Sequence, residues 1–261
     1  MFTQMALPSR SALPSASETP RSRSCSDQPG AQEVLAWIAV RYATTVDQIA
    51  VGTHTLSLRA VRDTNALLDA IDPATFTEDE RLPYWADLWP SSIELARSCL
   101  SDFRLANKRV LELGCGLGLA GIAAALSGAL VTMTDYEPDA LMFARWNALA
   151  NLDPETFHSR VTLRQLDWRK GAGTELFDVV IGSDIVYEQR NLDPLLTMLT
   201  NVLAPVGYGV FTDPGRRTGR EFVSEATRRG FIVETAETHV PWRGRQQMIV
   251  RYVLRRPGGG A

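Results

Sequence analysis

From about residue 82 to the end of the chain, short apolar runs alternate with longer stretches in which apolar residues recur at helical spacing. The apolar runs predict strands at 109–113, 130–134, 161–166, 177–182, 209–212, 231–234 and 247–253. The helical stretches are 119–126, 138–150, 192–203 and 221–229. Repeated strand–helix units of this kind predict an α/β fold in which a doubly wound, mostly parallel sheet carries helices on both faces.

The first 80 residues follow a different pattern, which divides them in two. Residues 1–30 are rich in Ser, Pro and Arg and show no apolar core, so we expect a disordered leader. An Arg- and Ser-rich, acid-poor leader is also typical of a mitochondrial presequence, but three prolines interrupt any amphipathic helix there. Residues 31–80 are predicted to form an N-terminal extension of a helix, a hairpin over 46–58, a short helix after Asp63 and an acidic loop at 72–80. Residues 81–261 then form the main domain.

Composition and charge exclude several classes of protein. The chain has 261 residues, of which 45% are hydrophobic and 22% are charged, as in ordinary globular proteins. Its net charge of −3 argues against a general nucleic-acid binder. Because no apolar stretch approaches the length needed to cross a bilayer, we expect no membrane partner. Nothing in the sequence indicates the oligomeric state, and a monomer is favoured.

The cysteines and histidines predict neither a zinc site nor a disulfide framework. Cys25, Cys99 and Cys115 are odd in number and include no Cys-x-x-Cys pair, and the three histidines lie far apart along the chain. We therefore expect no metal and a reducing compartment, namely the cytoplasm, or the mitochondrion if the leader is a transit peptide.

Four acidic residues stand at the ends of four consecutive predicted strands. They are Glu112, Asp135, Asp167 and Asp184, the last directly after Ser183. In open α/β sheets, ligands bind beyond the carboxyl ends of the strands, where such side chains gather. This constellation predicts a binding site at that edge of the sheet.

A glycine-rich turn follows the first of these strands. It reads Glu112-Leu113-Gly114-Cys115-Gly116-Leu117-Gly118, and residues 116–121 also satisfy the generic G-x-G-x-x-G pattern of dinucleotide binders. Glycines allow a sharp turn and a close approach to a ligand. A carboxylate at Asp135 could accept hydrogen bonds from both ribose hydroxyls of a nucleoside, in NAD or in another cofactor.

The run Leu-Glu-Leu-Gly-Cys-Gly over 111–116 resembles the first motif of seven-strand, class I methyltransferases that use S-adenosylmethionine. The resemblance implies a Rossmann-like, seven-stranded sheet and S-adenosylmethionine as the cofactor. It also implies that Asp167 and Trp168 lie near the adenine, although core packing is the alternative for Trp168. The cofactor-binding residues implied by the motifs are Trp89, Glu112, Gly114, Gly116, Gly118, Asp135, Asp167, Trp168 and Ser183.

Two further segments narrow the resemblance. The stretch Tyr84-Trp85-Ala86-Asp87-Leu88-Trp89-Pro90-Ser91-Ser92 and the stretch Ser183-Asp184-Ile185-Val186-Tyr187 are similar to family-16 methyltransferases, which mostly modify protein lysines. Asp184 and Tyr187 match the D-x-x-Y motif of that family, which implies a catalytic role for both. Together with Asp213-Pro214-Gly215-Arg216, the pattern resembles bacterial relatives of the lysine methyltransferase that acts on the electron-transfer flavoprotein beta subunit. The resemblance covers roughly residues 80 to 255.

The resemblance implies an S-adenosylmethionine-dependent methyltransferase with a protein lysine as its substrate. Asp184 would orient the amine, although a helix N-cap is an alternative role for it. Other functions stay open: a small-molecule N-methyltransferase, a non-catalytic methyltransferase-like binding protein, or an NAD-dependent oxidoreductase. No Tyr-x-x-x-Lys pair follows the fourth strand to support the last. Arg216, Arg217 and Arg220 could face an acidic protein substrate or simply form a solvated helix start.

Overall fold

The computed structural model describes residues 29–69, 82–171, 173 and 175–258, so the predicted leader and acidic loop lie outside the described residues. The helices are α1 (Ala31–Arg41), α2 (Thr64–Asp69), α4 (Pro90–Ser101), α5 (Leu119–Leu126), α6 (Pro138–Asn151), α7 (Pro154–Arg160), α8 (Leu192–Val202) and α9 (Arg217–Arg228). The strands are β1 (Thr44–Val51), β2 (His54–Val61), β3 (Arg109–Leu113), β4 (Leu130–Asp135), β5 (Val161–Gln165), β6 (Phe177–Ser183), β7 (Leu203–Asp213), β8 (Ile232–Trp242) and β9 (Arg245–Arg255). Short 3-10 turns cover Tyr84–Ala86, Trp168–Lys170 and Gln189–Asn191.

The main sheet has seven strands in the order β5-β4-β3-β6-β7-β9-β8. The pairs from β5 to β7 are parallel, and β9 is antiparallel to both β7 and β8. After β5 the chain returns to the middle of the sheet, so β3 and β6 are neighbours whose following loops leave in different directions. This reversal of strand order is where open α/β sheets bind their ligands. The predicted doubly wound, mostly parallel sheet is confirmed.

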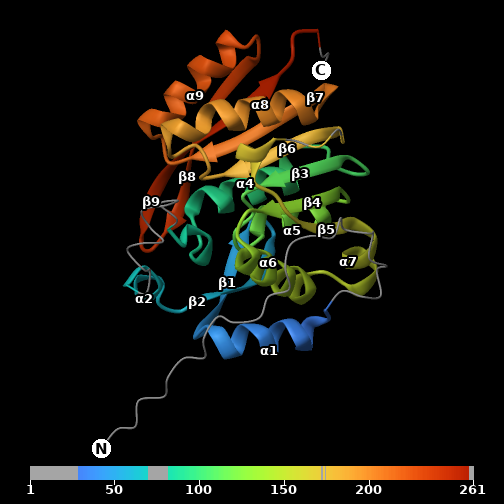
Figure 1. Ribbon diagram of the computed structural model, residues 1–261, viewed down its shortest axis with the longest axis vertical. Helices are drawn as coiled ribbons and strands as arrows, with labels where there is room; N and C mark the ends of the chain where they lie inside the picture. Colours follow the sequence, from blue (N-terminus) through green and yellow to red (C-terminus); the bar gives the residue numbers. More distant parts are fainter. Residues whose placement is uncertain (1–28, 70–81, 172, 174, 259–261) are drawn as a thin grey trace, which may run out of the picture.

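Alternating residues of the inner strands face two separate cores. Val110 of β3 belongs to a cluster with the apolar residues of α1, α4, α5 and α6, whereas Leu111 belongs to a cluster with those of α8 and α9. In Figure 1, α8 and α9 lie toward the β6–β7 end of the molecule, and α1 with β1 and β2 lies toward the other end. Because the sheet is covered on both faces, its inner strands are almost wholly apolar, which is why their sequence signal is strong.

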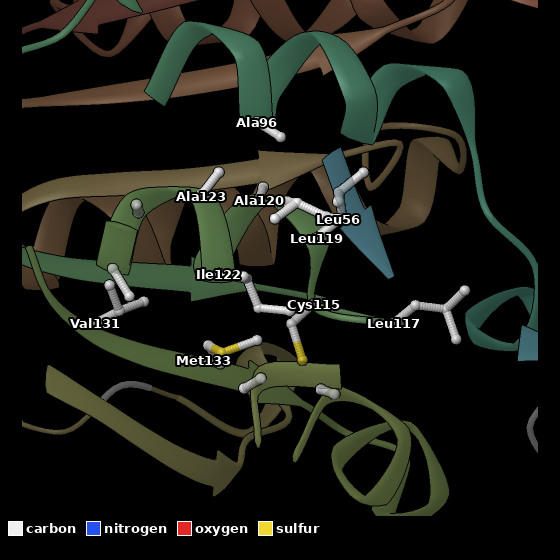
Figure 2. Close-up of a cluster of buried hydrophobic side chains, with 14 of the residues drawn as sticks. Leu56, Ala96, Cys115, Leu117, Leu119, Ala120, Ile122, Ala123, Val131 and Met133 are labelled. Atoms are coloured by element: carbon white, nitrogen blue, oxygen red, sulfur yellow. The ribbon is translucent and has the colours of Figure 1, made fainter. Parts of the chain in front are cut away.

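The β1–β2 hairpin is fastened to α6 by two asparagines one helical turn apart. Asn151 accepts a hydrogen bond from the Ser57 amide at 2.8 Å and donates to the Ser57 carbonyl at 2.7 Å. Asn147 pairs in the same way with the backbone of Arg59, at 2.7 and 3.1 Å. The two amides thus serve the edge of β2 as a neighbouring strand would. Figure 2 shows Leu56 of the hairpin in one cluster with Ala96 of α4 and Met133 of β4.

The N-terminal extension therefore shares a core with the main domain, and the predicted boundary near residue 80 stays a prediction. Two helices, α4 and α7, are absent from the predicted elements, and β7 and β8 are longer than predicted. The helix α4 buries Ser91, Glu94 and Ser98, which break the apolar periodicity of its sequence. Glu94 is accommodated because Arg97, at 2.7 Å, and Ser98, at 3.1 Å, donate hydrogen bonds to it.

None of the helices in the described ranges is both long and apolar enough to cross a membrane.

Candidate functional site

A cavity of about 330 Å³ opens at the carboxyl ends of β3, β4 and β6. Its volume lies within the range of roughly 300–1,000 Å³ that is typical of small-molecule sites. All but one of the residues predicted for the site line this cavity: Trp89, Gly114, Gly116, Gly118, Asp135, Asp167, Trp168, Ser183, Asp184 and Tyr187. The structure thus brings residues from five separate segments of the chain into one place.

The glycine loop between β3 and α5 forms one wall of the cavity. Gly118 has φ of +84°, and a Cβ there would lie 2.5 Å from the Met133 Cε, so both the backbone and the space require glycine. Gly116 donates its amide to Asp135 Oδ2 at 2.9 Å. The loop is therefore tied to the end of the neighbouring strand β4.

Asp135 lies at the centre of this arrangement. Its Oδ1 accepts the Glu137 amide at 3.0 Å, and its side chain belongs to the cavity lining although only 5% of the residue is exposed. Burial raises the pKa of the Asp135 carboxyl to about 6. A carboxylate of this kind keeps further lone pairs that can accept hydrogen bonds from hydroxyl groups of a ligand.

Glu112 is the predicted residue that the structure places elsewhere. It is 2% exposed, it does not line the cavity, and its Oε2 lies beside Gly121 at the start of α5. Among the described residues, this oxygen has no hydrogen-bond partner. Burial raises the pKa of Glu112 to about 8. The Glu112 side chain thus lies outside the cavity lining, and its contact with a cofactor stays a prediction.

The far wall of the cavity is aromatic. The Trp168 ring lies 3.6 Å from the position that a Cβ on Gly114 would take, and its indole nitrogen is buried without a partner in the described part of the chain. Asp167 accepts hydrogen bonds from the Arg169 side chain at 2.8 and 2.9 Å, and this contact lowers the pKa of Asp167. Asp167 and Trp168 thus contribute an ionised carboxylate and an aromatic ring to the same side of the cavity lining.

Tyr136 is a lining residue that the sequence reasoning missed. It directly follows Asp135, and the Arg169 guanidinium lies 5.2 Å from its ring centroid. Its position next to a predicted strand-end acid was the signal that could have identified it.

Asp184 and Tyr187 lie together on the loop after β6. Asp184 has φ of +56°, and its amide donates to the Thr212 carbonyl at 2.8 Å, which fixes the turn. Its side chain is 8% exposed; Oδ1 accepts a hydrogen bond from Arg216, whereas Oδ2 is buried without a partner among the described residues. Arg216 therefore does not form only a solvated helix start, because it reaches across to this carboxylate.

An aromatic group forms the mouth of the cavity beside Asp184. The Tyr187 and Tyr84 rings meet edge to face at 5.4 Å between centroids, and Tyr84 meets Trp89 at 6.0 Å. The Trp89 indole donates to the Tyr84 carbonyl at 2.8 Å. Trp85 packs between Tyr42 and Phe143 and also belongs to the cavity lining. Burial raises the pKa of Tyr187 to about 12, so its hydroxyl stays protonated.

Cys115 is buried beside the cavity, and burial raises the pKa of its thiol well above the usual value, which favours the protonated thiol over the reactive thiolate. Within the described ranges, no three His, Cys, Asp or Glu side chains gather as candidate metal ligands.

The sheet order and the placement of the cavity define a class I methyltransferase fold, as comparison with solved structures shows. The glycopeptide N-methyltransferase MtfA matches with a TM-score of 0.52 at 18% identity, covering 65% of this chain and 92% of that one. A ribosomal protein L11 methylase from Lactobacillus delbrueckii subsp. bulgaricus matches with a TM-score of 0.50 at 19% identity, covering 63% and 78%. At these identities the likeness concerns the fold alone.

The chain belongs to the lysine methyltransferase family, whose model matches residues 75–225. It is 38% identical over 113 residues to the protein N-lysine methyltransferase METTL21A of Xenopus tropicalis, covering 42% of this chain and 52% of that protein. It is 36% identical over 138 residues to the electron transfer flavoprotein beta subunit lysine methyltransferase of Danio rerio, covering 51% of each. The chain thus spans about half the length of the curated relatives it matches. The predicted family is confirmed.

Proposed function

We propose that the protein transfers a methyl group from S-adenosylmethionine to a lysine side chain of another protein. One observation carries the proposal: a single cavity joins the glycine loop and Asp135 to Asp184 and an aromatic mouth. The names of the relatives, which are lysine methyltransferases, support the choice of acceptor.

The residues of the cavity fit this cofactor. The glycine loop offers backbone without side chains, Asp135 offers hydroxyl acceptors, and the Trp168 indole is a buried donor that lacks a partner in the described residues. We propose that these groups, with Gly114, Gly116, Gly118, Asp167 and Ser183, hold the nucleoside and its amino acid part. When bound, S-adenosylmethionine supplies a methyl group that its sulfonium has already activated.

Asp184 and the aromatic residues at the mouth of the cavity would bind and orient the acceptor lysine. A lysine amine has a pKa of about 10.4, and only its neutral form has a lone pair that can attack. The free Oδ2 of Asp184 can accept a hydrogen bond from that amine and orient it. Tyr84, Trp89 and Tyr187 surround the entrance with apolar surface that suits the four-carbon stem of a lysine. Alignment of this kind is the main contribution a protein can make to a transfer between activated partners.

The proposal is tested by incubating the protein with S-adenosylmethionine carrying a labelled methyl group and with a cell lysate. Proteins are separated on a gel, and a labelled band is hydrolysed to identify the modified amino acid. We expect labelled methyllysine in one or a few bands. Label only in small molecules, or on another amino acid, would contradict the proposal.

Asp184→Asn separates chemistry from binding. The amide is isosteric but loses the charge, so we expect affinity for the uncharged product S-adenosylhomocysteine within about threefold of wild type, and turnover at saturating S-adenosylmethionine lower by about 10²-fold. The matched control is Asp193→Asn, which changes an exposed aspartate on α8 outside the cavity lining. Turnover near that of wild type would remove Asp184 from the reaction and leave it as a turn-forming residue.

We also propose that the protein acts in the cytoplasm as a monomer. The free, buried thiols of Cys99 and Cys115 support a reducing compartment. Cell fractionation and the solution mass of the purified protein test the two statements.

A further inference from the structure

Arg216 makes an ion pair with the predicted catalytic carboxylate. Its guanidinium binds Asp184 Oδ1, and the same nitrogen lies 3.8 Å from Asp213 Oδ2. The contact joins residues 32 positions apart, and Arg216 belongs to the cavity lining. The cation therefore lies in the cavity wall, beside the group that is proposed to hold the acceptor amine.

The loop that carries Arg216 is built around a buried anchor. Asp213 is fully buried and accepts hydrogen bonds from the Gly215 amide at 2.7 Å and from the Tyr252 hydroxyl at 3.0 Å. Gly215 has φ of +78°, and a Cβ there would lie 2.6 Å from the Met248 Cε. The backbone that delivers Arg216 is thus fixed by packing, so its contact with Asp184 is not an incidental surface pair.

The two carboxylate oxygens of Asp184 differ in their hydrogen bonding. Oδ1 is occupied by Arg216, and Oδ2 is buried yet lacks a partner among the described residues. A buried carboxylate oxygen without a partner is costly, so its presence points to a ligand donor. The arrangement leaves one oxygen for an amine and keeps a cation on the other side of the same carboxylate.

We propose that Arg216 is a positioning residue that aims Asp184 and keeps the acceptor amine neutral. This inference rests on the proposed function. A lone carboxylate favours the ammonium form, which cannot attack, whereas a nearby cation disfavours it. Arg216 therefore offsets the charge of Asp184, so that the amine gives its proton to water more readily while still finding a hydrogen-bond acceptor.

The other charged and titratable groups around Asp184 do not replace Arg216. On the same loop, Glu188 pairs with Arg190 at 2.6 Å, and Tyr187 keeps its proton. Asp213 is fully buried and lies outside the cavity lining, so the carboxylate that would face the amine is that of Asp184. The titratable residues that the described part of the chain contributes to the cavity lining are Tyr84, Asp87, Cys115, Asp135, Tyr136, Glu137, Asp167, Arg169, Asp184, Tyr187, Glu188, Arg190 and Arg216. Asp213 lies behind Arg216, outside this lining.

The test needs no knowledge of the acceptor, because it compares two cofactor analogues by calorimetry at pH 7.5. Sinefungin carries an amine where the cofactor has its methyl-bearing sulfonium, and S-adenosylhomocysteine is uncharged there. The measured quantity is the ratio of the affinity for sinefungin to the affinity for S-adenosylhomocysteine. In Arg216→Gln we expect this ratio to be about tenfold higher than in wild type. Removal of a nearby cation favours the protonated amine, and a tenfold change corresponds to a rise of about one in the pKa of that amine. Arg216→Lys retains the charge and should keep the wild-type ratio within about twofold.

The matched control is Arg217→Gln, which removes the adjacent arginine. That side chain is 83% exposed, pairs with Glu221 at 2.8 Å and lies outside the cavity lining, so the ratio should not change. Affinity for S-adenosylhomocysteine shows whether the site is intact. If Arg216 only held the structure together, its loss would weaken the binding of this uncharged analogue as well. An unchanged ratio in Arg216→Gln would overturn the inference while leaving the proposed function intact. Failure of wild type to bind either analogue would overturn both.

Discussion

Glu112 and Asp135 are two buried carboxyl groups that lie beneath and beside the glycine loop. Burial raises both pKa values, to about 8 for Glu112 and about 6 for Asp135, and the charge of Asp135 adds to the rise in the pKa of Glu112. Only Asp135 reaches the cavity lining. The pair therefore has different consequences: Glu112 affects how stability depends on pH, and Asp135 affects ligand binding.

Glu112→Gln should make the protein more stable at pH 8. The pKa of Glu112 rises on folding from 4.5 to about 8, so the folded state binds the proton more tightly and loses stability as pH increases through this window. An amide carries no such cost, so the variant should gain on the order of a few kcal/mol at pH 8 and nothing at pH 4.5. Urea unfolding at both pH values measures this. An equal decline of stability with pH in both proteins would show that Glu112 does not titrate there.

Asp135→Ala should weaken S-adenosylmethionine binding by about 1.5–3 kcal/mol, which is the scale of charge-assisted hydrogen bonds. Part of the loss would come through the loop, because the same carboxylate holds the Gly116 amide. Calorimetry measures the affinity, and circular dichroism checks that the variant is folded. Unchanged affinity in a folded variant would remove Asp135 from the proposed cofactor site.

At the residue scale, the sequence predicted the side chains that directly follow an apolar run. Asp135 and Asp184 could be found because a buried strand ends next to each of them. The partner of Asp184 could not be found in the same way, because Arg216 lies 32 residues further on and is brought in only by the pairing of β6 with β7. That Glu112 lies outside the cavity lining could not be read from the sequence, since the sequence indicates a strand but not which face each side chain takes.

At the element scale, α6 connects the hairpin to the glycine loop through Asn147. Besides the Arg59 backbone, this side chain donates to the Leu117 carbonyl at 2.9 Å, and it is fully buried. Asn147→Ala leaves three backbone groups without partners, so we expect a loss of about 2–4 kcal/mol in the free energy of unfolding. Hydrogen exchange should locate the loosening in β2 and in the loop around Leu117.

The control for that variant is Asn201→Ala, an exposed asparagine near the end of α8, which should change stability by less than about 0.5 kcal/mol. Equal effects of the two substitutions would show that the hairpin does not depend on Asn147.

Elements with a clear apolar period were predicted, and those without one were predicted only in part, as β8 was, or not at all, as with α4. The strand β8 is exposed along most of its length, so its sequence lacks the alternation that marks a half-buried strand. In the helix α4, buried polar residues interrupt the apolar periodicity. Burial of Glu94 among them is stabilised by its ion pairs with Arg97 and Arg251. In both cases the determining contacts are made by β9 or by neighbours on the same helix, and they exist only in the folded chain.

At the scale of the whole molecule, the cavity is lined by loops from both halves of the sheet. The glycine loop and Asp135 come from the β3–β4 half, and Asp184 and Arg216 come from the β6–β7 half. A ligand that contacts both halves binds only the folded protein, so it must raise the unfolding temperature. At 100 times its dissociation constant, S-adenosylmethionine should add about 2.7 kcal/mol, or roughly 5–10 °C for a chain of this size.

A comparison of S-adenosylmethionine with NAD tests which of the two cofactors the cavity binds, because the G-x-G-x-x-G pattern alone would allow either. Both molecules carry an adenosine whose ribose could reach Asp135, but the group attached to that ribose is a cationic sulfonium in S-adenosylmethionine and an anionic pyrophosphate in NAD. The Asp184 carboxylate in the same cavity would attract the first group and repel the second. We therefore expect a shift of the melting temperature with S-adenosylmethionine and less than about 1 °C with NAD at equal concentration. Differential scanning fluorimetry of wild type and Asp135→Ala measures the shifts, and the variant should lose most of the effect. A larger shift with NAD would reverse the assignment of the cofactor, because the binding free energy is read directly from the stabilisation it produces.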